Sequence, residues 1–266
     1  MVARESIEQY RAASSQLSKL VAAALEDYFG VLDLTKPDAV RDALLEFVPA
    51  LVAEYGQVAA AMAMEWYDQL RFESGGAGKY VAAAVIASSI TPERVEAKVR
   101  YAAGHLFDRE YEVETTDGGL SLVQRPAEPA KALAVLTGAT DKYVKQFGRE
   151  TVAWNAEREG VAWARVPTGA MTCSWCLILA SRDAVYTSER SASMRADGEK
   201  YHGFCDCQAV PIRPGDEYPD GYLPDDFYDM YQIARDAAGS GDMNDIAAAM
   251  RRKFPDAVTD GVVHAH

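Results

Sequence analysis

The sequence has few of the basic residues that a nucleic-acid-binding protein needs. Lys and Arg number 27 against 40 Asp and Glu, which gives a formal net charge of −13 and an isoelectric point of about 4.8. Affinity for a phosphate backbone comes largely from Lys and Arg side chains that displace counterions. The composition therefore argues against a protein whose main task is to bind nucleic acid, although a local basic patch is compatible with it.

Long hydrophobic runs are also missing. The first residues, "MVARESIEQYRAASSQ", carry charges where a secretory signal needs an uninterrupted apolar core. The most apolar run, "YVAAAVIASSI" at residues 80–90, is too short to span a bilayer. We therefore expect a soluble protein, made in the cytoplasm, without a membrane partner.

Sequence signatures of nucleotide-binding and metalloprotease sites are absent. The glycine-rich stretch "ESGGAGKY" at 73–80 has Glu73 where a P-loop needs glycine and Tyr80 where it needs Ser or Thr. We expect a linker between helices there. No HExxH pattern occurs anywhere in the chain, so nothing predicts a catalytic zinc of the metalloprotease kind.

Amphipathic helices dominate the first half of the chain. Hydrophobic residues make up 49% of the sequence, enough to build a core. Apolar residues recur at helical spacing from Ser6 to Tyr28, where Gly30 supplies a stop, and again from about Thr35 to Leu70. In this second helix we expect Pro49 and Gly56 to introduce a bend. Further helices are predicted at 79–89, 92–108, 127–158, 225–238 and 242–253, the last capped by Ser240 or Asp242.

Two segments lack a helical stripe. Residues 109–125 contain "DGG" and predict a loop or a short hairpin. From Gly160 to about Pro214 the sequence shows strand-like alternation and turns, and an acidic, tyrosine-rich loop, "RPGDEYPDGYLPDD", follows. All four cysteines of the chain fall within the stretch from Gly160 to about Pro214, which marks it as a separate module.

The cysteines form a pattern typical of metal chelation. Cys173 and Cys176 make a CxxC pair, and His202, Cys205 and Cys207 make an HxxCxC group. A tight turn can aim both sulfurs of a CxxC at one point, and an extended Cys-x-Cys places both thiolates on one face. Four protein ligands fill a tetrahedral shell and leave no position for a water nucleophile. The pattern thus predicts a structural zinc or another tetrahedral metal.

Several alternatives stay open at these residues. All four cysteines bind the metal with His202 in contact with a ligand, or His202 replaces Cys205 or Cys207. Two disulfides or four reduced buried cysteines are other interpretations. Disulfides are disfavoured by the reducing compartment and by the strain of a Cys205–Cys207 bond, although pairing of these two with Cys173 and Cys176 is geometrically open. A redox-active CxxC is disfavoured because no βαβ unit is legible around it.

These observations predict a mainly α fold of the α+β class. Long amphipathic helices are followed by a small zinc-stapled α+β module and two short C-terminal helices. We expect a helical docking region over 1–158, the Cys/His module over 159–214, and an acidic loop with the C-terminal helices over 215–266.

Two stretches of the module resemble a known phage family. They are "ARVPTGAMTCSWCLILASRDAVYTSE" and "YHGFCDCQAVPI", which follow a long helical half. Together they are similar to the phage Mu F-type head morphogenesis proteins, also called minor capsid proteins, in the form found in tailed phages of actinobacteria. The family often has prolines before the histidine and Arg between the last two cysteines, whereas this chain has Lys200, Tyr201 and Asp206. The resemblance therefore does not imply a basic contact at residue 206.

The resemblance implies a protein of the virion, made in the host cytoplasm and placed inside the phage head near the portal. Its implied partners are the portal protein, the major capsid protein or both, with several copies per particle possible and at most weak DNA contact. Some related proteins are labelled capsid maturation proteases. Here the candidates for such chemistry are Ser181 with His202, or His105, but we expect His202 to serve the metal and His105 to pack on a helix.

We therefore predict an assembly protein without catalytic or cofactor-binding residues. The alternatives are a capsid maturation protease that cleaves scaffold or capsid protein, and a DNA-associated protein ejected with the genome.

Overall fold

The mainly α, α+β class is confirmed by a computed structural model, which describes residues 4–75, 80–114, 118–168, 172–182, 205 and 207–258. Within these residues the chain forms seven α-helices, one short 3-10 helix (η1) and four strands in two antiparallel sheets. In chain order these elements are α1 (Arg4–Gly30), α2 (Pro37–Glu73), α3 (Pro92–Ala103), η1 (Gly104–Leu106), β1 (Arg109–Glu114), β2 (Leu120–Arg125), α4 (Pro129–Glu159), β3 (Ala162–Val166), α5 (Ser174–Ala180), β4 (Gln208–Ile212), α6 (Pro224–Ala238) and α7 (Met243–Lys253).

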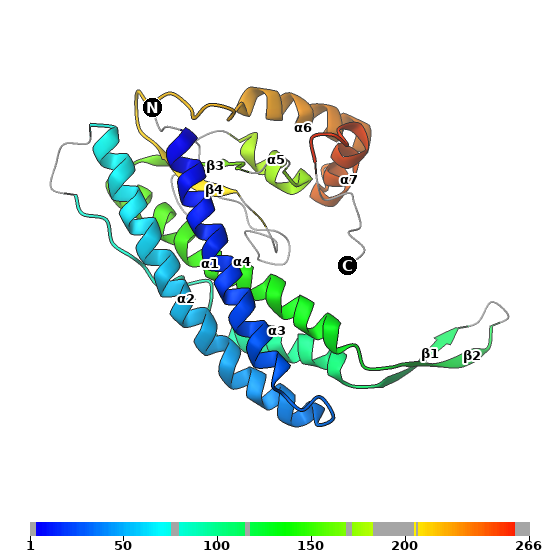
Figure 1. Cartoon of the computed structure of the whole chain (residues 1–266). Coiled ribbons are helices and arrows are strands. Elements are labelled where there is room, and N and C mark those ends of the chain that lie inside the picture. The colour runs from blue at the N-terminus through cyan, green and yellow to red at the C-terminus, as the bar shows by residue number, and fades with distance from the viewer. Residues whose placement is uncertain are drawn as a thin grey trace.

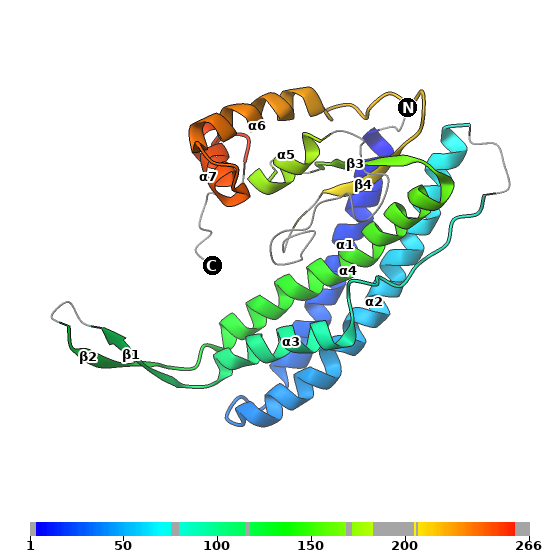
Figure 2. The same ribbon diagram turned by 180° about the vertical axis from the view of Figure 1, so that it is seen from behind.

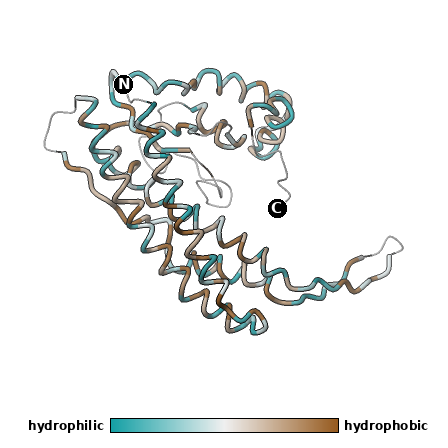
Figure 3. The backbone as a smooth tube through the Cα atoms, viewed as in Figure 1, coloured by the Kyte–Doolittle hydropathy of each residue, from teal (hydrophilic) through white to brown (hydrophobic). Residues whose placement is uncertain are grey.

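Three long helices, α1, α2 and α4, run side by side and form the body of the molecule (Figure 1). At one end of the body lie the β3–β4 sheet and the helices α5, α6 and α7; α3 covers the other end (Figure 2). The β1–β2 hairpin projects away from the end that α3 covers. The hydropathy of the chain follows this plan, with hydrophobic residues recurring along the long helices (Figure 3).

The core of the body comes from the apolar stripes that the sequence predicts. Leu25 of α1, Leu44 of α2 and Leu136 of α4 belong to one continuous cluster and are at most 1% exposed. Burying such a side chain contributes roughly 1.5–3 kcal/mol, so this stripe-on-stripe packing is the main stabilising term for the helices.

Small residues let α1, α2 and α4 approach closely. A Cβ atom at Gly56 would stand 2.7 Å from ring carbons of Phe147 on α4. A Cβ atom at Gly148 would stand 2.6 Å from the Tyr10 hydroxyl and 3.3 Å from the Ala59 carbonyl oxygen. The helix α2 runs unbroken from Pro37 to Glu73. Its glycine thus has a packing role that the sequence pattern did not reveal.

The predicted helix at 79–89 is wrong: the described residues 80–90 have no helix and follow an extended path beside α2 and α4. Asn155 of α4 acts here as a strand partner would, since its amide accepts from the Ala83 N–H at 3.0 Å and donates to the Ala83 carbonyl at 2.8 Å. Thr151 accepts from the Val85 N–H at 3.3 Å. These bonds satisfy backbone groups of the segment and outweigh the helix propensity of its alanines.

Other predicted elements form with small shifts in their bounds. In the segment predicted as a loop or short hairpin, β1 and β2 pair antiparallel, and the helix predicted at 92–108 ends as α3 and η1 by Leu106. Asp242 caps α7 by accepting from two backbone N–H groups, those of Asn244 and Asp245, at 2.8 and 3.3 Å. The helix α5 was not predicted, because it is short and lies within the cysteine pattern.

One helix among the described residues, α2, is long and apolar enough to cross a membrane by length and composition. Core helices of water-soluble proteins meet the same criterion. In this structure α2 packs against α1, α3 and α4, which accounts for its apolar character.

A partly buried carboxylate joins the body to the β3–β4 sheet. Glu159, at the end of α4, accepts from the Tyr67 hydroxyl at 2.6 Å and pairs with Arg71 at 2.8 Å and Arg213 at 3.0 Å. Burial acts to raise the pKa of Glu159, but the hydrogen bonds from Tyr67, Arg71 and Arg213 outweigh it and hold the pKa below the ordinary 4.5. The network ties α2, α4 and the residue that follows β4 to a single charge.

We predict that Gly56→Ala destabilises the protein. The added methyl collides with Phe147, and overpacking of this kind costs about 1–3 kcal/mol, more than the helix propensity gained. The midpoint temperature of thermal unfolding should fall by several degrees. Gly30→Ala is the matched control because a Cβ there meets nothing within 4 Å, and it should leave the unfolding temperature nearly unchanged. Equal effects of the two substitutions would contradict the packing role.

We also predict that Glu159→Gln lowers the free energy of unfolding at pH 7 by about 2 kcal/mol, since it leaves two partly buried arginines without their carboxylate. Because the folded pKa is depressed, the stabilisation is present above the unfolded value and is lost as pH falls through the folded pKa. In denaturant titrations, the difference in the free energy of unfolding between wild type and variant should therefore become smaller below about pH 4. Glu157→Gln, on the exposed face of the same turn, is the control.

Candidate metal centre

The first half of the cysteine pattern lies at the start of α5. Cys173 is the N-cap of this helix, and its sulfur accepts a hydrogen bond from the Cys176 N–H at 3.2 Å. A thiol thus takes the place of the Ser or Asp side chain that usually satisfies the first N–H groups of a helix. The first turn of α5 places Cys173 and Cys176 in the same buried cluster, where they are 7% and 1% exposed.

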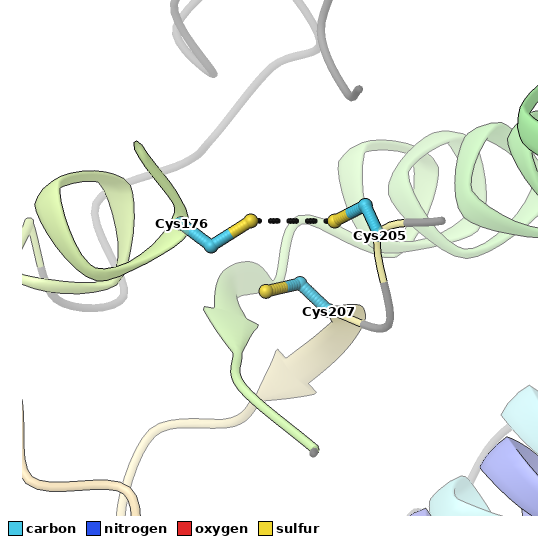
Figure 4. Close-up of side chains that lie close together, drawn as sticks. All are labelled: Cys176, Cys205 and Cys207. Carbon is cyan, nitrogen blue, oxygen red and sulfur yellow. Dashed lines mark hydrogen bonds between the residues drawn. The ribbon is translucent and has the colours of Figure 1, made fainter. Parts of the chain in front are cut away.

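The second half of the pattern lies just before β4. Cys205 and Cys207 are 2% and 3% exposed, and they face Cys176 across a narrow gap (Figure 4). The sulfurs of Cys176, Cys205 and Cys207 all lie within 4.8 Å of one another, and those of Cys176 and Cys205 are 3.3 Å apart. The structure therefore brings together residues from two segments that are far apart in the chain.

These three sulfurs have the spacing that a tetrahedral ion needs. With a zinc–sulfur bond of about 2.3 Å, ligand sulfurs stand roughly 3.8 Å apart, close to what the cluster offers. The four cysteines form no disulfide, and the shortest of these sulfur contacts is well beyond the bond length of about 2.05 Å. Cys173 lies in the same buried cluster, next to Cys176. The donor set fits a metal that prefers thiolates.

The electrostatics of the cluster point in the same direction. Interaction with Cys176 and Cys205, followed by burial, raises the pKa of the Cys207 thiol well above its usual value. Several thiolates cannot be buried side by side without a compensating charge. A divalent cation supplies the compensating charge, so its cysteine ligands lose their protons when it binds. The Cys207 thiol therefore keeps its proton in the absence of a cation and can supply a thiolate to one.

A buried arginine on α4 fixes the loop that carries the second pair. Arg149 is 4% exposed; its Nε donates to the Cys207 carbonyl at 3.2 Å, and its Nη2 donates to the Cys205 carbonyl. Sequence reasoning missed this residue. A signal existed, because Arg149 shares a face of α4 with the buried Val152 and Ala156, three and seven positions further on.

The β3–β4 sheet and the C-terminal helices enclose the cluster. Trp163 of β3 and Val210 of β4 share one core with Val152 and Ala156 of α4. Ile178 of α5 packs in a second core with α6 and α7. The start of α5 is also tied to α7, since Arg251 donates to the Ser174 hydroxyl at 3.2 Å. The cluster is thus surrounded by packed elements.

His202, the remaining predicted ligand, lies outside the described residues, as does Asp206. The described part of the chain therefore brings together Cys173, Cys176, Cys205 and Cys207. The two interpretations of the ligand set, with and without His202, both remain predictions.

The structure does not bring the other candidate residues together. Ser181 follows α5, is 8% exposed, and donates its hydroxyl to the Ile178 carbonyl at 2.8 Å. His105 lies in η1, directly after α3, and α3 and α5 are at opposite ends of the body in both ribbon views. Desolvation and the nearby Lys131 and Arg109 lower the pKa of His105, and its ring meets Tyr101 edge-on. Ser181 and His105 do not form a nucleophile–base pair.

Comparison with known proteins places the chain among bacteriophage proteins. It is similar to the Gene 15 protein of Mycobacterium phage D29, with 29% identity over 121 residues that cover 34% of this chain and 44% of the relative. It is also similar to the Gene 15 protein of Mycobacterium phage L5, with 25% identity over 148 residues that cover 41% and 50%. The chain thus spans half or less of the length of these curated relatives.

No solved structure matches the chain. The family model described as VG15 protein matches residues 1–234, a range that includes both halves of the cysteine pattern. A match over most of the sequence shows that the chain belongs to the VG15 protein family of bacteriophages.

Proposed function

We propose that this protein is a minor capsid protein of the Mu F type, which acts in head morphogenesis and resides in the virion near the portal. Two findings support the proposal. The relatives are phage gene products, and the segments that resemble the Mu F-type family contain the cysteines that the fold assembles. The observation that carries the proposal is the convergence of three buried sulfurs within 4.8 Å. These sulfurs come from both stretches that resemble the family, and the fold brings the two stretches together at one site.

The proposed metal is a structural zinc. Its candidate ligands are Cys173, Cys176, Cys205, Cys207 and His202, of which four fill the shell. A zinc whose shell is filled by protein ligands cross-links the chain. Here it would close the loop between α5 and β4, and it would hold both against Arg149 of α4, so binding energy becomes folding energy.

The helical region, residues 1–158, is the proposed docking part, and 159–214 with 215–266 form the module and its cover. Exposed apolar side chains on the long helices, among them Leu20 of α1 and Val58 of α2, offer contacts to the portal or major capsid protein. These two side chains are 58% and 44% exposed, so a partner helix or surface can reach them.

We expect native mass spectrometry of the purified protein to show one zinc, which is lost together with the fold on denaturation. Cys207→Ser should abolish zinc retention, because it removes a sulfur from the converging set. His202→Ala separates the two ligand sets: it retains zinc if all four cysteines bind and loses it if His202 is a ligand.

His105→Ala is the matched histidine control and should leave the zinc in place, because η1 lies away from the cluster. A protein that carries no metal and keeps four thiols when purified in zinc-containing buffer would overturn the metal site. A mass lower by about four hydrogens would mean disulfides instead.

The assembly role predicts that the chain is incorporated into procapsids only when its partners are present. Co-expression with the portal and major capsid proteins of the same phage should yield particles that contain the chain, and omission of the portal should deplete it. Leu20→Glu and Val58→Glu should weaken incorporation, whereas Lys19→Glu, on the same helix as Leu20, should not.

The alternatives give different outcomes in the same system. Cleavage of scaffold or capsid protein that stops with Ser181→Ala or His105→Ala would establish a maturation protease. Retardation of DNA at low salt, lost as salt is raised, would support the DNA-associated role. Incorporation that is indifferent to the portal and to both helix substitutions would contradict the docking proposal.

A further inference from the structure

The β1–β2 hairpin is an arm that touches little of its own chain. It leaves the body beyond α3 and α4, and its two strands pack chiefly on each other (Figures 1 and 2). Within the described residues, both long edges of this two-stranded ribbon lack a neighbouring strand. Each edge therefore presents unpaired backbone donors and acceptors, which another strand can use.

Apolar side chains lie on both faces of the arm. The register pairs Tyr111 with Val123 on one face and Glu112 with Leu122 on the other. Tyr111 and Val113 are 45% and 41% exposed, and Leu120 and Leu122 are 70% and 59% exposed. A two-stranded ribbon is marginal by itself in water, so these side chains gain when a further strand is added.

The two edges differ in charge. β1 has four charged residues, Arg109, Glu110, Glu112 and Glu114, whereas β2 has no charged residue from Leu120 to Gln124. Natural proteins protect open edges against strand pairing with charges, proline or bulges. β1 has that protection and β2 lacks it over most of its length. The unprotected edge is therefore β2.

We propose that β2 pairs antiparallel with β2 of a second copy of this chain and makes a four-stranded sheet. The pairing centres on Leu122, which lies opposite Leu122 of the second copy. Leu120 then lies opposite Gln124 of the second copy, and Ser121 opposite Val123 of the second copy. This register pairs the whole uncharged stretch with itself and opposes no like charges.

Pairing of β1 with β1 of a second copy places like charges opposite each other. A register centred on Tyr111 opposes Glu110 to Glu112 of the second copy, and one centred on Glu110 or Glu112 opposes a carboxylate to its own copy. Like charges directly opposite each other destabilise a sheet. The charge pattern thus favours β2 over β1 for pairing with a second copy, and the uncharged stretch of β2 is complementary to itself.

The length of the arm makes the pairing possible for an acidic protein. Each chain has a net charge of −13, so the bodies repel each other. The arm holds them apart, and exposed charges beyond roughly 8 Å are largely screened at 0.15 M salt. The contact area is small, so the dimer is weak and depends on concentration. Its association strengthens as salt rises, opposite to an interface held by ion pairs.

Sedimentation velocity of the full chain over a range of concentrations and salt tests the proposal. We expect a monomer–dimer equilibrium that shifts toward dimer with salt. Leu122→Lys should shift the wild-type dimer to monomer under the same conditions, because it places two like charges opposite each other. Val113→Lys, an exposed position on β1, is the matched control and should dimerise as the wild type does. Circular dichroism should be unchanged in both variants.

Cross-linking tests the register. Leu122→Cys should give an oxidised dimer whose disulfide joins two copies of the peptide that contains residue 122, since residues directly opposite are about 5 Å apart. Leu120→Cys should not, because the two copies stand about 13 Å apart in this register. A monomer at all concentrations and salts, a dimer that survives Leu122→Lys, or equal cross-linking of the two cysteine variants would overturn the proposal.

Discussion

The constraint on which the structure depends is the burial of α4 on nearly all its sides. Its second half is enclosed by α1, α2, the 80–90 segment and the β3–β4 sheet, so polar side chains such as Arg149 and Asn155 lie inside the protein. A buried polar group without a partner costs several kcal/mol. Each of these side chains bonds a neighbouring segment, and these bonds decide where the segments lie. Asn155 holds the backbone at Ala83, Arg149 holds Cys205 and Cys207, and Glu159 holds Arg213.

This arrangement explains how a cluster of thiols can be prepared by the helical body. The CxxC pair is positioned locally, by the cap of α5, but the second pair has no regular structure before β4 begins. Its position comes from Arg149, whose guanidinium spans two carbonyls. A rigid donor fork is suited to this role, since it fixes direction as well as distance. The position of the cysteine cluster therefore depends on the helical body, although the sequence pattern assigns the two to different regions.

The sequence predicted what local periodicity controls and missed what long-range side-chain contacts control. The stripes of α1, α2 and α4 are local, and so are the Asp242 cap and the spacing of the cysteines; all are legible from residues near one another in the chain. The path of residues 80–90 depends on Asn155, which no local pattern connects to Ala83. At Gly56 the sequence pattern predicts a bend. The packing role of this glycine was missed because the ring of Phe147, which leaves no room for a Cβ atom, lies on another helix. The role of Arg149 was hidden for the same reason.

The arm differs from the rest of the chain because its apolar side chains are exposed. Where α4 is enclosed, Arg149 and Asn155 bond other segments of the chain, and the net charge of −13 is left to the outer surface. The arm carries exposed leucines and an uncharged edge beyond that surface, where no other described strand of this chain pairs with them. Keeping such an edge costs solubility and offers no stability to the monomer. An apolar edge placed outside the acidic body is therefore best explained by contact with another chain, and the charge on β1 leaves β2 as the strand that can make it.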